Sequence, residues 1–121
     1  MVIIDSSIWA DSYRTGVPEL TARLSRGEVL QHPFVTGELA LGNPRDRNAL
    51  IAMLDALPQA PLVGHAALMH LIVELALGGT GIGYVDAQLL ASTRKAGAAL
   101  WTRDKRLMKQ AERLGLLHSP D

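Results

Sequence analysis

The 121-residue sequence predicts an α/β fold, a three-layer α/β/α sandwich built on a short and mostly parallel sheet. Short apolar runs with strand character, at 2–4 and 98–102, alternate with longer stretches in which apolar residues recur at helical spacing. Strands that alternate with helices in a chain of this length are typical of a parallel sheet covered by helices on both faces. Neither an internal repeat nor a linker is visible, so residues 1–121 are expected to form one domain.

In the first half of the chain, proline and glycine mark the ends of the expected elements. The apolar run Val2–Ile4 reads as a buried strand because β-branched residues suit a sheet that is covered on both faces. Asp5 then ends this strand, and Ser6 or Ser7 is expected to cap the next helix, although Asp5 itself is an equally acceptable cap. The further expected elements are a helix ending at Gly16, a helix from Pro18 to Gly27, a strand at Val29–Leu30, a helix after Pro33 capped by Thr36, and a helix started by Asn43 and Pro44.

The second half contains a glycine-rich run at 78–83 that needs its own interpretation. A phosphate-binding loop of the Walker type ends in Gly-Lys-Ser/Thr, whereas this run ends in Gly83 and Tyr84. We therefore interpret it as a flexible connector that allows a close backbone approach, in preference to a nucleotide cradle. The elements expected around it are a short strand at 61–63, a helix over 66–77, a helix from Tyr84 to Ala96 stopped by Gly97, a strand at 98–102, a helix beginning at Asp104, and a final strand at Leu116 and Leu117.

The composition excludes several classes of protein. The chain has no cysteine, which excludes disulfides, zinc–thiolate sites and thiol nucleophiles. Asp5 interrupts the N-terminal apolar run and no basic segment precedes it, so we expect a cytoplasmic protein without a secretory signal. The longest apolar stretch, 66–77, contains His70 and Glu74 and is too short to span a membrane.

Four acidic residues stand at comparable places in the expected fold. Asp5 ends the first strand, and Glu38 lies in the first turns of a helix. Asp86 and Asp104 lie where helices begin after the glycine run and after the last strand. The carboxyl ends of parallel strands and the starts of the following helices share one edge of the sheet, so these acids are expected to converge. Each acid alone also has a simple structural explanation, because helix N-termini favour negative charge by a few tenths to about 1 kcal/mol.

The expected acid cluster requires a cation. Several carboxylates within a few ångströms of one another repel and raise one another's pKa unless a positive charge neutralises them. Oxygen ligands without His or Cys suit Mg²⁺ or Mn²⁺ better than zinc. Sites of this kind hydrolyse phosphodiesters, because the metal lowers the pKa of a bound water and neutralises the attacking and leaving oxygens.

Basic residues are concentrated near the C-terminal end. The formal net charge is zero, which argues against a protein that coats nucleic acid non-specifically. A solvated helix face and a rim that contacts RNA phosphates remain alternative interpretations of this segment. Between residues 94 and 113 the two acids Asp104 and Glu112 stand among seven basic residues, namely Arg94, Lys95, Arg103, Lys105, Arg106, Lys109 and Arg113.

The sequence resembles the PIN-domain ribonucleases over essentially its whole length, and most closely the VapC-type toxins of bacterial toxin–antitoxin pairs. Each motif alone is weak, but together, in this order and at these separations, they are specific. The motifs are Ile3-Ile4-Asp5-Ser6-Ser7, Thr36-Gly37-Glu38-Leu39-Ala40, Tyr84-Val85-Asp86-Ala87 and Leu100-Trp101-Thr102-Arg103-Asp104.

This resemblance implies a Mg²⁺- or Mn²⁺-dependent endoribonuclease with a PIN-like fold. On the metal route, in which an activated water and not the ribose 2′-OH attacks, the products are expected to carry a 5′-phosphate and a 3′-hydroxyl. The resemblance further implies a homodimer, a tRNA- or rRNA-class substrate, and inhibition by a VapB-type antitoxin that places a basic side chain in the acidic site. The residues expected to act are the acids Asp5, Glu38, Asp86 and Asp104 as catalytic and metal-binding groups, the supporting hydroxyls Ser7 and Thr102, and the RNA-binding residues Arg103, Lys105 and Arg106.

One position departs from the family pattern. Many relatives carry another acid two residues after the last aspartate, followed by an aromatic residue. Here these positions hold Arg106 and Leu107. The departure puts a second metal site in doubt, and Arg106 instead offers a positive charge to the RNA backbone.

Other functions have weaker support. The four histidines show no metal-binding spacing, so a metal-free histidine mechanism is a minor alternative. Phosphotransfer through Asp5 typically requires a second aspartate where this chain has Ser7. A non-catalytic binding module is the remaining alternative. Trp9 and Trp101 lie in apolar runs and are expected in the core.

Overall fold

The structure, a computed structural model, describes residues 1–119. Its sheet has three parallel strands in the order β2-β1-β3, so the first strand in sequence lies in the middle. The elements follow one another along the chain as β1 (Val2–Ile4), α1 (Ser6–Thr15), α2 (Pro18–Ser25), β2 (Val29–Leu30), α3 (Pro33–Leu41), α4 (Arg47–Asp55), α5 (His65–Glu74), α6 (Tyr84–Ala96), β3 (Ala99–Trp101) and α7 (Lys105–Arg113).

Strand β1 is buried along its whole length because it has a parallel neighbour on each side and helices over both faces. Ile3 is paired with Leu30 of β2 and with Leu100 of β3. Ile3 and Ile4 are fully buried. A strand in this position has no solvated face, which explains why its sequence is continuously apolar and does not alternate.

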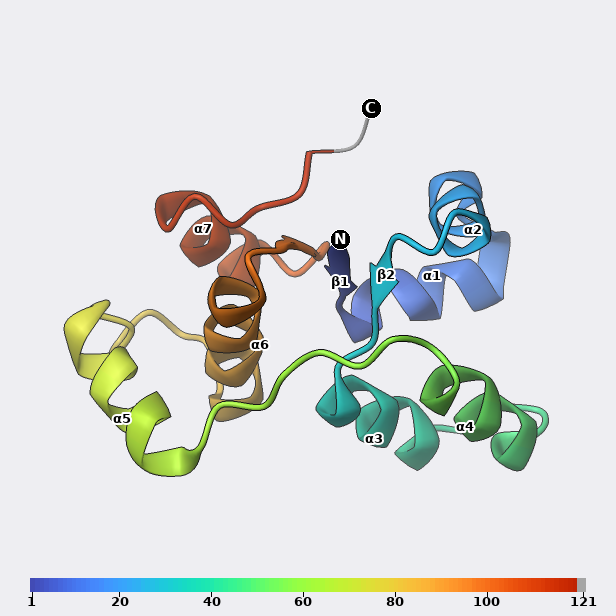
Figure 1. The fold of residues 1–121 in the computed structure, drawn as a ribbon, viewed down its shortest axis with the longest axis horizontal. Coiled ribbons are helices and arrows are strands. Elements are labelled where there is room, and N and C mark those ends of the chain that lie inside the picture. The colour runs from blue at the N-terminus through green and yellow to red at the C-terminus, as the bar shows by residue number, and fades with distance from the viewer. Residues whose placement is uncertain (120–121) are drawn as a thin grey trace.

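Helices cover the sheet from two sides, as Figure 1 shows. Helices α1 and α2 lie on one side, whereas α6 and α7 lie on the other with α5 outside α6. Helices α3 and α4 pack together at the lower end of the sheet in this view, where the strands end. The predicted α/β/α arrangement is therefore confirmed. No helix in the described part of the chain is long and apolar enough to cross a membrane.

The prediction that Thr36 caps the third helix is wrong. Helix α3 begins at Pro33, and His32 caps it by accepting a hydrogen bond from the N–H of Phe34 at 3.0 Å. Thr36 lies inside the helix, where its buried hydroxyl accepts a hydrogen bond from the Gln31 side chain at 3.0 Å. The His32 ring is buried, and its other nitrogen lies 3.0 Å from the Ser92 hydroxyl of α6.

The start of α4 is also misplaced in the sequence analysis. Asn43 and Pro44 lie in a loop, and the helix begins three residues later than their pairing suggests. Asp46 is the cap, accepting a hydrogen bond from the N–H of Ala49 at 3.0 Å. The side chain of Arg47 donates to carbonyls at the end of α3, and this contact fixes the loop and decides between the two candidate caps.

The segment predicted as a strand at 61–63 is not one. The carbonyl and N–H of Val63 are both bonded to the side-chain amide of Gln88 in α6, at 2.9 and 2.7 Å. Pro61 has no N–H to donate to a neighbouring strand. Among residues 1–119, the only sheet-like contact near this segment is a single parallel bridge between Gln59 and Gln31. Likewise, the predicted last strand is reduced to one bridge between Leu117 and Leu100.

Two large apolar residues of the helices lie at the surface. Tyr13 is 58% exposed and Leu41 is 89% exposed, although helical spacing places both near apolar neighbours. Both tryptophans, in contrast, are buried as predicted. Periodicity identifies the apolar side of a helix but not where the surrounding elements end.

We predict that His32 makes the fold acid-sensitive. Burial lowers the pKa of His32 to about 4. In the folded chain its Nδ1 accepts the Phe34 N–H and its Nε2 lies 3.0 Å from the Ser92 hydroxyl. The unfolded chain binds this proton near pH 6.5, so stability is complete above that pH and falls towards pH 4 by about 3 kcal/mol. Urea unfolding at several pH values should show this loss in wild type and a much smaller loss in His32→Asn.

The matched control for this measurement is His70→Asn, which removes an exposed histidine on α5. This variant should keep the wild-type pH dependence. An unchanged dependence in His32→Asn would contradict the assignment.

Candidate active site

A cavity of about 560 Å³ opens at the carboxyl ends of the strands. It brings together the four acids that the sequence singles out, although they come from four different segments of the chain. Their arrangement follows from the parallel topology, which places strand ends and helix starts on one edge. The lining residues are Asp5, Ser6, Ser7, Ala10, Glu38, Leu39, Asp86 and Asp104.

Asp5 is the buried acid of this cavity, with only 5% of its surface exposed. Its Oδ2 accepts hydrogen bonds from the hydroxyls of Ser7 and Thr102, both at 2.8 Å. Its main-chain N–H donates to the carbonyl of Trp101 at 2.9 Å, which extends the pairing of β1 with β3. Asp5 occupies the cap position of α1, but its side chain makes no capping bond. The expectation that Ser6 or Ser7 caps this helix is therefore wrong, and Ser7 instead orients Asp5.

The other two aspartates each use one oxygen to stabilise a helix start. Asp86 accepts a hydrogen bond from the N–H of Gly83 at 3.2 Å. The Oδ1 of Asp104 accepts from the N–H groups of Arg106 and Leu107, at 3.0 and 3.2 Å. The structural and functional interpretations of these acids are thus compatible, because a carboxylate has a second oxygen that such a cap leaves free.

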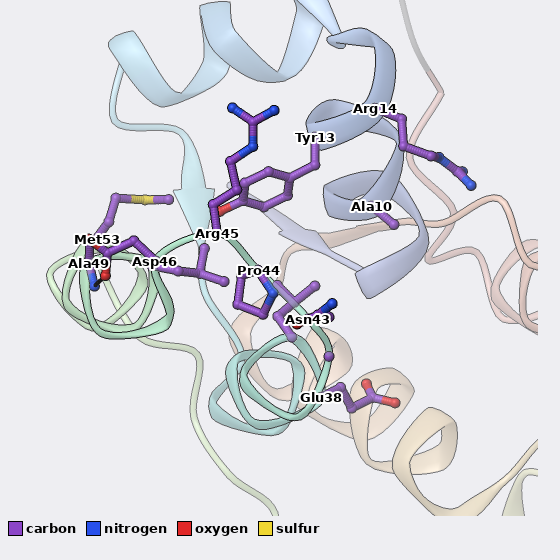
Figure 2. A pocket seen from close by; sticks show the side chains of 13 residues that line it. Ala10, Tyr13, Arg14, Glu38, Asn43, Pro44, Arg45, Asp46, Ala49 and Met53 are labelled. Atoms are coloured by element: carbon purple, nitrogen blue, oxygen red, sulfur yellow. Dashed lines mark hydrogen bonds between the residues drawn. The ribbon is translucent and has the colours of Figure 1, made fainter.

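Glu38 differs from the aspartates because it makes no hydrogen bond in the described part of the chain. It projects from the second turn of α3 and is exposed. Figure 2 shows its carboxylate pointing away from Tyr13, Arg45 and Met53. Its flexible side chain can adjust its position, whereas Asp5 is fixed.

The crowding of negative charge in the cavity affects the pKa values of two of the acids. The pKa of Glu38 is raised by partial desolvation of its otherwise exposed carboxyl and, to a smaller extent, by the charges of Asp5 and Asp86. The pKa of Asp86 is also raised, mainly by burial, with further contributions from Asp5 and Asp104, although the Gly83 bond opposes the rise. The protein thus holds these carboxylates in a place where their charge is unfavourable.

The donor chemistry of this cavity fits Mg²⁺ or Mn²⁺. All four titratable groups are carboxyls, and Ser7 and Thr102 add hydroxyls behind Asp5. Across residues 1–119, however, no three His, Asp or Glu side chains are arranged to hold a metal ion as they stand. Binding of such an ion would therefore require rotation of the exposed carboxyls.

The three basic residues predicted to bind RNA have different surroundings. Arg103 is paired with Asp11 of α1, which also pairs with Arg14. Arg106 packs against Gly81, whose φ of +89° and lack of a side chain leave room for it, since an added Cβ would lie 3.0 Å from the Arg106 Cδ. Lys105 is exposed at the start of α7. The glycine run is thus a connector as predicted, and Gly81 also accommodates Arg106.

The histidines do not contribute to the acidic cavity. His32 and His118 are buried, the latter 3.3 Å from Glu19 and with its ring centroid 5.1 Å from that of Trp101. None of the four lines the cavity. The arrangement gives no support to the metal-free histidine mechanism.

A second and larger cavity of about 880 Å³ lies next to the acidic one, between α1, α3 and α4. Figure 2 shows the side chains that line it, which are mostly apolar and include Tyr13, Pro44 and Met53. The two cavities share Ala10, Glu38 and Leu39 and are therefore continuous. Helical periodicity does not predict this surface, because its lining comes from loop ends as well as helix faces.

The chain is similar to known proteins both in sequence and in fold. Over 108 residues, 88% of its length, the chain is 41% identical to Ribonuclease VapC32 from two strains of Mycobacterium tuberculosis, of which 87% is covered. It also matches the crystal structure of PAE2754 from Pyrobaculum aerophilum with a TM-score of 0.55 and 16% identity, over 93% of this chain and 85% of the other. The second similarity concerns the fold alone. No family model matches the sequence.

We predict that Glu38→Gln stabilises the metal-free protein. Its pKa is raised in the folded state, so the ionised group is unfavourable there and stability falls as pH rises through its titration. Because Glu38 is exposed and solvent screens it, the gain should be small, about 0.5 kcal/mol near pH 7. Thermal unfolding in EDTA measures this gain.

Glu112→Gln on the exposed face of α7 is the matched control and should leave the stability nearly unchanged. Adding Mg²⁺ should stabilise wild type more than Glu38→Gln. A destabilised Glu38→Gln in EDTA would contradict the electrostatic picture.

Proposed function

This chain belongs to the VapC-type PIN-domain toxins, and from that premise we propose that it is a metal-dependent endoribonuclease controlled by a VapB-type antitoxin. The observation that carries the proposal is the convergence of Asp5, Glu38, Asp86 and Asp104 on one cavity. The relatives that match the chain over most of their length are ribonucleases by name. We propose RNA of the tRNA or rRNA class as the substrate and a homodimer as the active form.

The acids would hold Mg²⁺ or Mn²⁺, with Asp5 as the fixed ligand. Ser7 and Thr102 occupy one oxygen of Asp5 and so direct the other towards the cavity, while Glu38 adjusts to complete the site. Each hydroxyl has a single hydrogen and both are given to Asp5, so their own 3.5 Å separation is only a contact. When bound, the metal would lower the pKa of a water molecule and neutralise charge on the phosphodiester oxygens.

Arg106 occupies the position where many relatives carry a further acid. Its side chain is held over the glycine run, and its guanidinium lies 3.4 Å from the Gly81 carbonyl. Leu107 is fully buried in the core, so the apolar residue at the next position serves packing. These two contacts support a site with one metal ion and an added positive charge at its rim.

The apolar cavity is where we propose that the antitoxin binds. It is continuous with the acidic cavity through Ala10, Glu38 and Leu39, so a segment bound there has direct access to the acids. Exposed Tyr13 and Met53 provide apolar contact surface on both sides of it. A basic side chain at the end of such a segment would neutralise Glu38 and compete with the metal.

We predict that Asp5→Asn abolishes RNA cleavage and that Thr102→Val reduces it by about 10- to 100-fold, because the hydroxyl orients the ligand without being one. Purified, antitoxin-free protein is incubated with a small-RNA pool in Mn²⁺ or EDTA, and the cut ends are mapped. Cuts should require metal and carry 5′-phosphate and 3′-hydroxyl ends.

Asp55→Asn, which removes an exposed carboxylate at the end of α4, serves as the control and should cut like wild type. Cuts that persist in EDTA, or cyclic phosphate ends, would refute the metal mechanism. Wild type that binds RNA and antitoxin but never cuts would favour the non-catalytic binding module.

We also predict that Met53→Glu weakens the complex with the proposed VapB-type antitoxin. The substitution places a charge in the apolar cavity, and burying an unpaired charge is costly. Titration calorimetry should show at least about tenfold weaker binding, with Mn²⁺-dependent cleavage retained.

Ala52→Glu provides the matched control, since Ala52 is the exposed neighbour on α4 that does not line the cavity. It should bind like wild type. Equal affinities of the two variants would exclude this cavity as the antitoxin site.

A further inference from the structure

Two arginines, Arg14 on α1 and Arg103 in the loop between β3 and α7, form ion pairs with the same acid, Asp11. Arg14 is paired with Oδ1 of Asp11, and Arg103 is paired with Oδ2 of the same carboxylate. The two arginines lie far apart in the sequence and meet only in the folded chain. A single carboxylate cannot neutralise two guanidinium groups, so the cluster keeps a net positive charge.

The cluster is linked to the acidic cavity by helix α1. Ser7 and Asp11 lie one turn apart on the same face of this helix. The Ser7 hydroxyl donates to Asp5 and accepts a hydrogen bond from the main-chain N–H of Arg103 at 3.1 Å. One helix face therefore holds Arg103 at two points, by its main chain and by its guanidinium.

The arginines keep most of their donors available. Arg14 and Arg103 have side chains that are 72% and 51% exposed, whereas Asp11 between them is only 21% exposed. Figure 2 shows the Arg14 side chain leaving α1 in the direction away from Tyr13. A guanidinium has five N–H donors in a planar fork that matches phosphate oxygens, and the contact with Asp11 occupies only part of this fork.

Stability alone does not account for this arrangement. Ion pairs between exposed side chains contribute little to folding, from zero to about 1 kcal/mol. The negative charge of the neighbouring acids opposes the approach of RNA, so a chain with no net charge needs a local positive group to retain the strand.

We propose that Asp11 positions Arg14 and Arg103 as a phosphate-binding pair, which holds the RNA backbone beside the phosphodiester that enters the acidic cavity. The proposal rests on the proposed function, because it takes RNA as the substrate. Asp11 is a positioning residue in this scheme and contacts no RNA itself.

The proposal is tested by whether Asp11→Asn raises or lowers the affinity for RNA. If Asp11 only adds negative charge, Asp11→Asn makes the protein more positive and RNA binds more tightly. If Asp11 positions the arginines, Asp11→Asn releases them and RNA binds more weakly, by about threefold or more. Fluorescence anisotropy with a short labelled oligouridine in EDTA measures this affinity at several salt concentrations, without any cleavage.

Three further variants support the measurement. Asp55→Asn removes the same charge from an exposed acid on α4 and should bind RNA as tightly as wild type or more tightly. Asp11→Glu keeps the carboxylate and should restore most of the affinity. Arg103→Gln should reduce the salt dependence of log K by about 0.7, as expected for the loss of one phosphate contact to a single strand. Thermal unfolding verifies that every variant is folded.

The proposal is overturned if Asp11→Asn binds RNA as tightly as Asp55→Asn, or if wild type does not bind the RNA. Binding is measured without metal, so a failure of metal-dependent cleavage would leave this result standing and would affect only the proposed function.

Discussion

The site depends on the pairing of β1 between β2 and β3. This pairing places the end of β1 beside the end of β3, so that Asp5 meets Thr102 and its N–H is bonded to the Trp101 carbonyl. The same backbone geometry directs α1, which follows Asp5, so that Ser7 returns to the carboxylate. A buried carboxylate with two hydroxyl donors is held in one orientation, and the other acids are arranged around it.

In the acidic cavity, folding stability and the proposed function oppose each other. Burial and mutual repulsion raise the pKa values of Glu38 and Asp86, so keeping them ionised at neutral pH costs folding free energy. The core offsets this cost, since β1, α6 and α7 supply a continuous set of buried apolar side chains. Where Asp86 and Asp104 also cap their helices, the same side chain contributes to the fold and to the cavity.

The arginines of the basic segment have different roles. Arg113 donates to the Leu75 carbonyl at the end of α5 and so acts as a structural cap. Arg106 and Arg103, in contrast, surround the start of α7, close to Asp104. The basic segment noted in the sequence therefore divides into structural and site-facing members, which neither of its simple interpretations anticipates.

The sequence by itself determined the parallel α/β fold, helix α6 and the acids that share one edge, because short-range patterns encode these features. Apolar runs define strands, Gly97 with its positive φ stops α6, and strand ends and helix starts coincide in any parallel unit. The tertiary structure alone decided which polar groups pair. His32, and not Thr36, caps α3, and its ring also contacts Ser92 of α6. Val63 is bonded to the Gln88 side chain and not to a neighbouring strand. Asp11 pairs with arginines from two segments that are distant in sequence. These polar pairings depend on contacts between distant parts of the chain, which local sequence patterns do not predict.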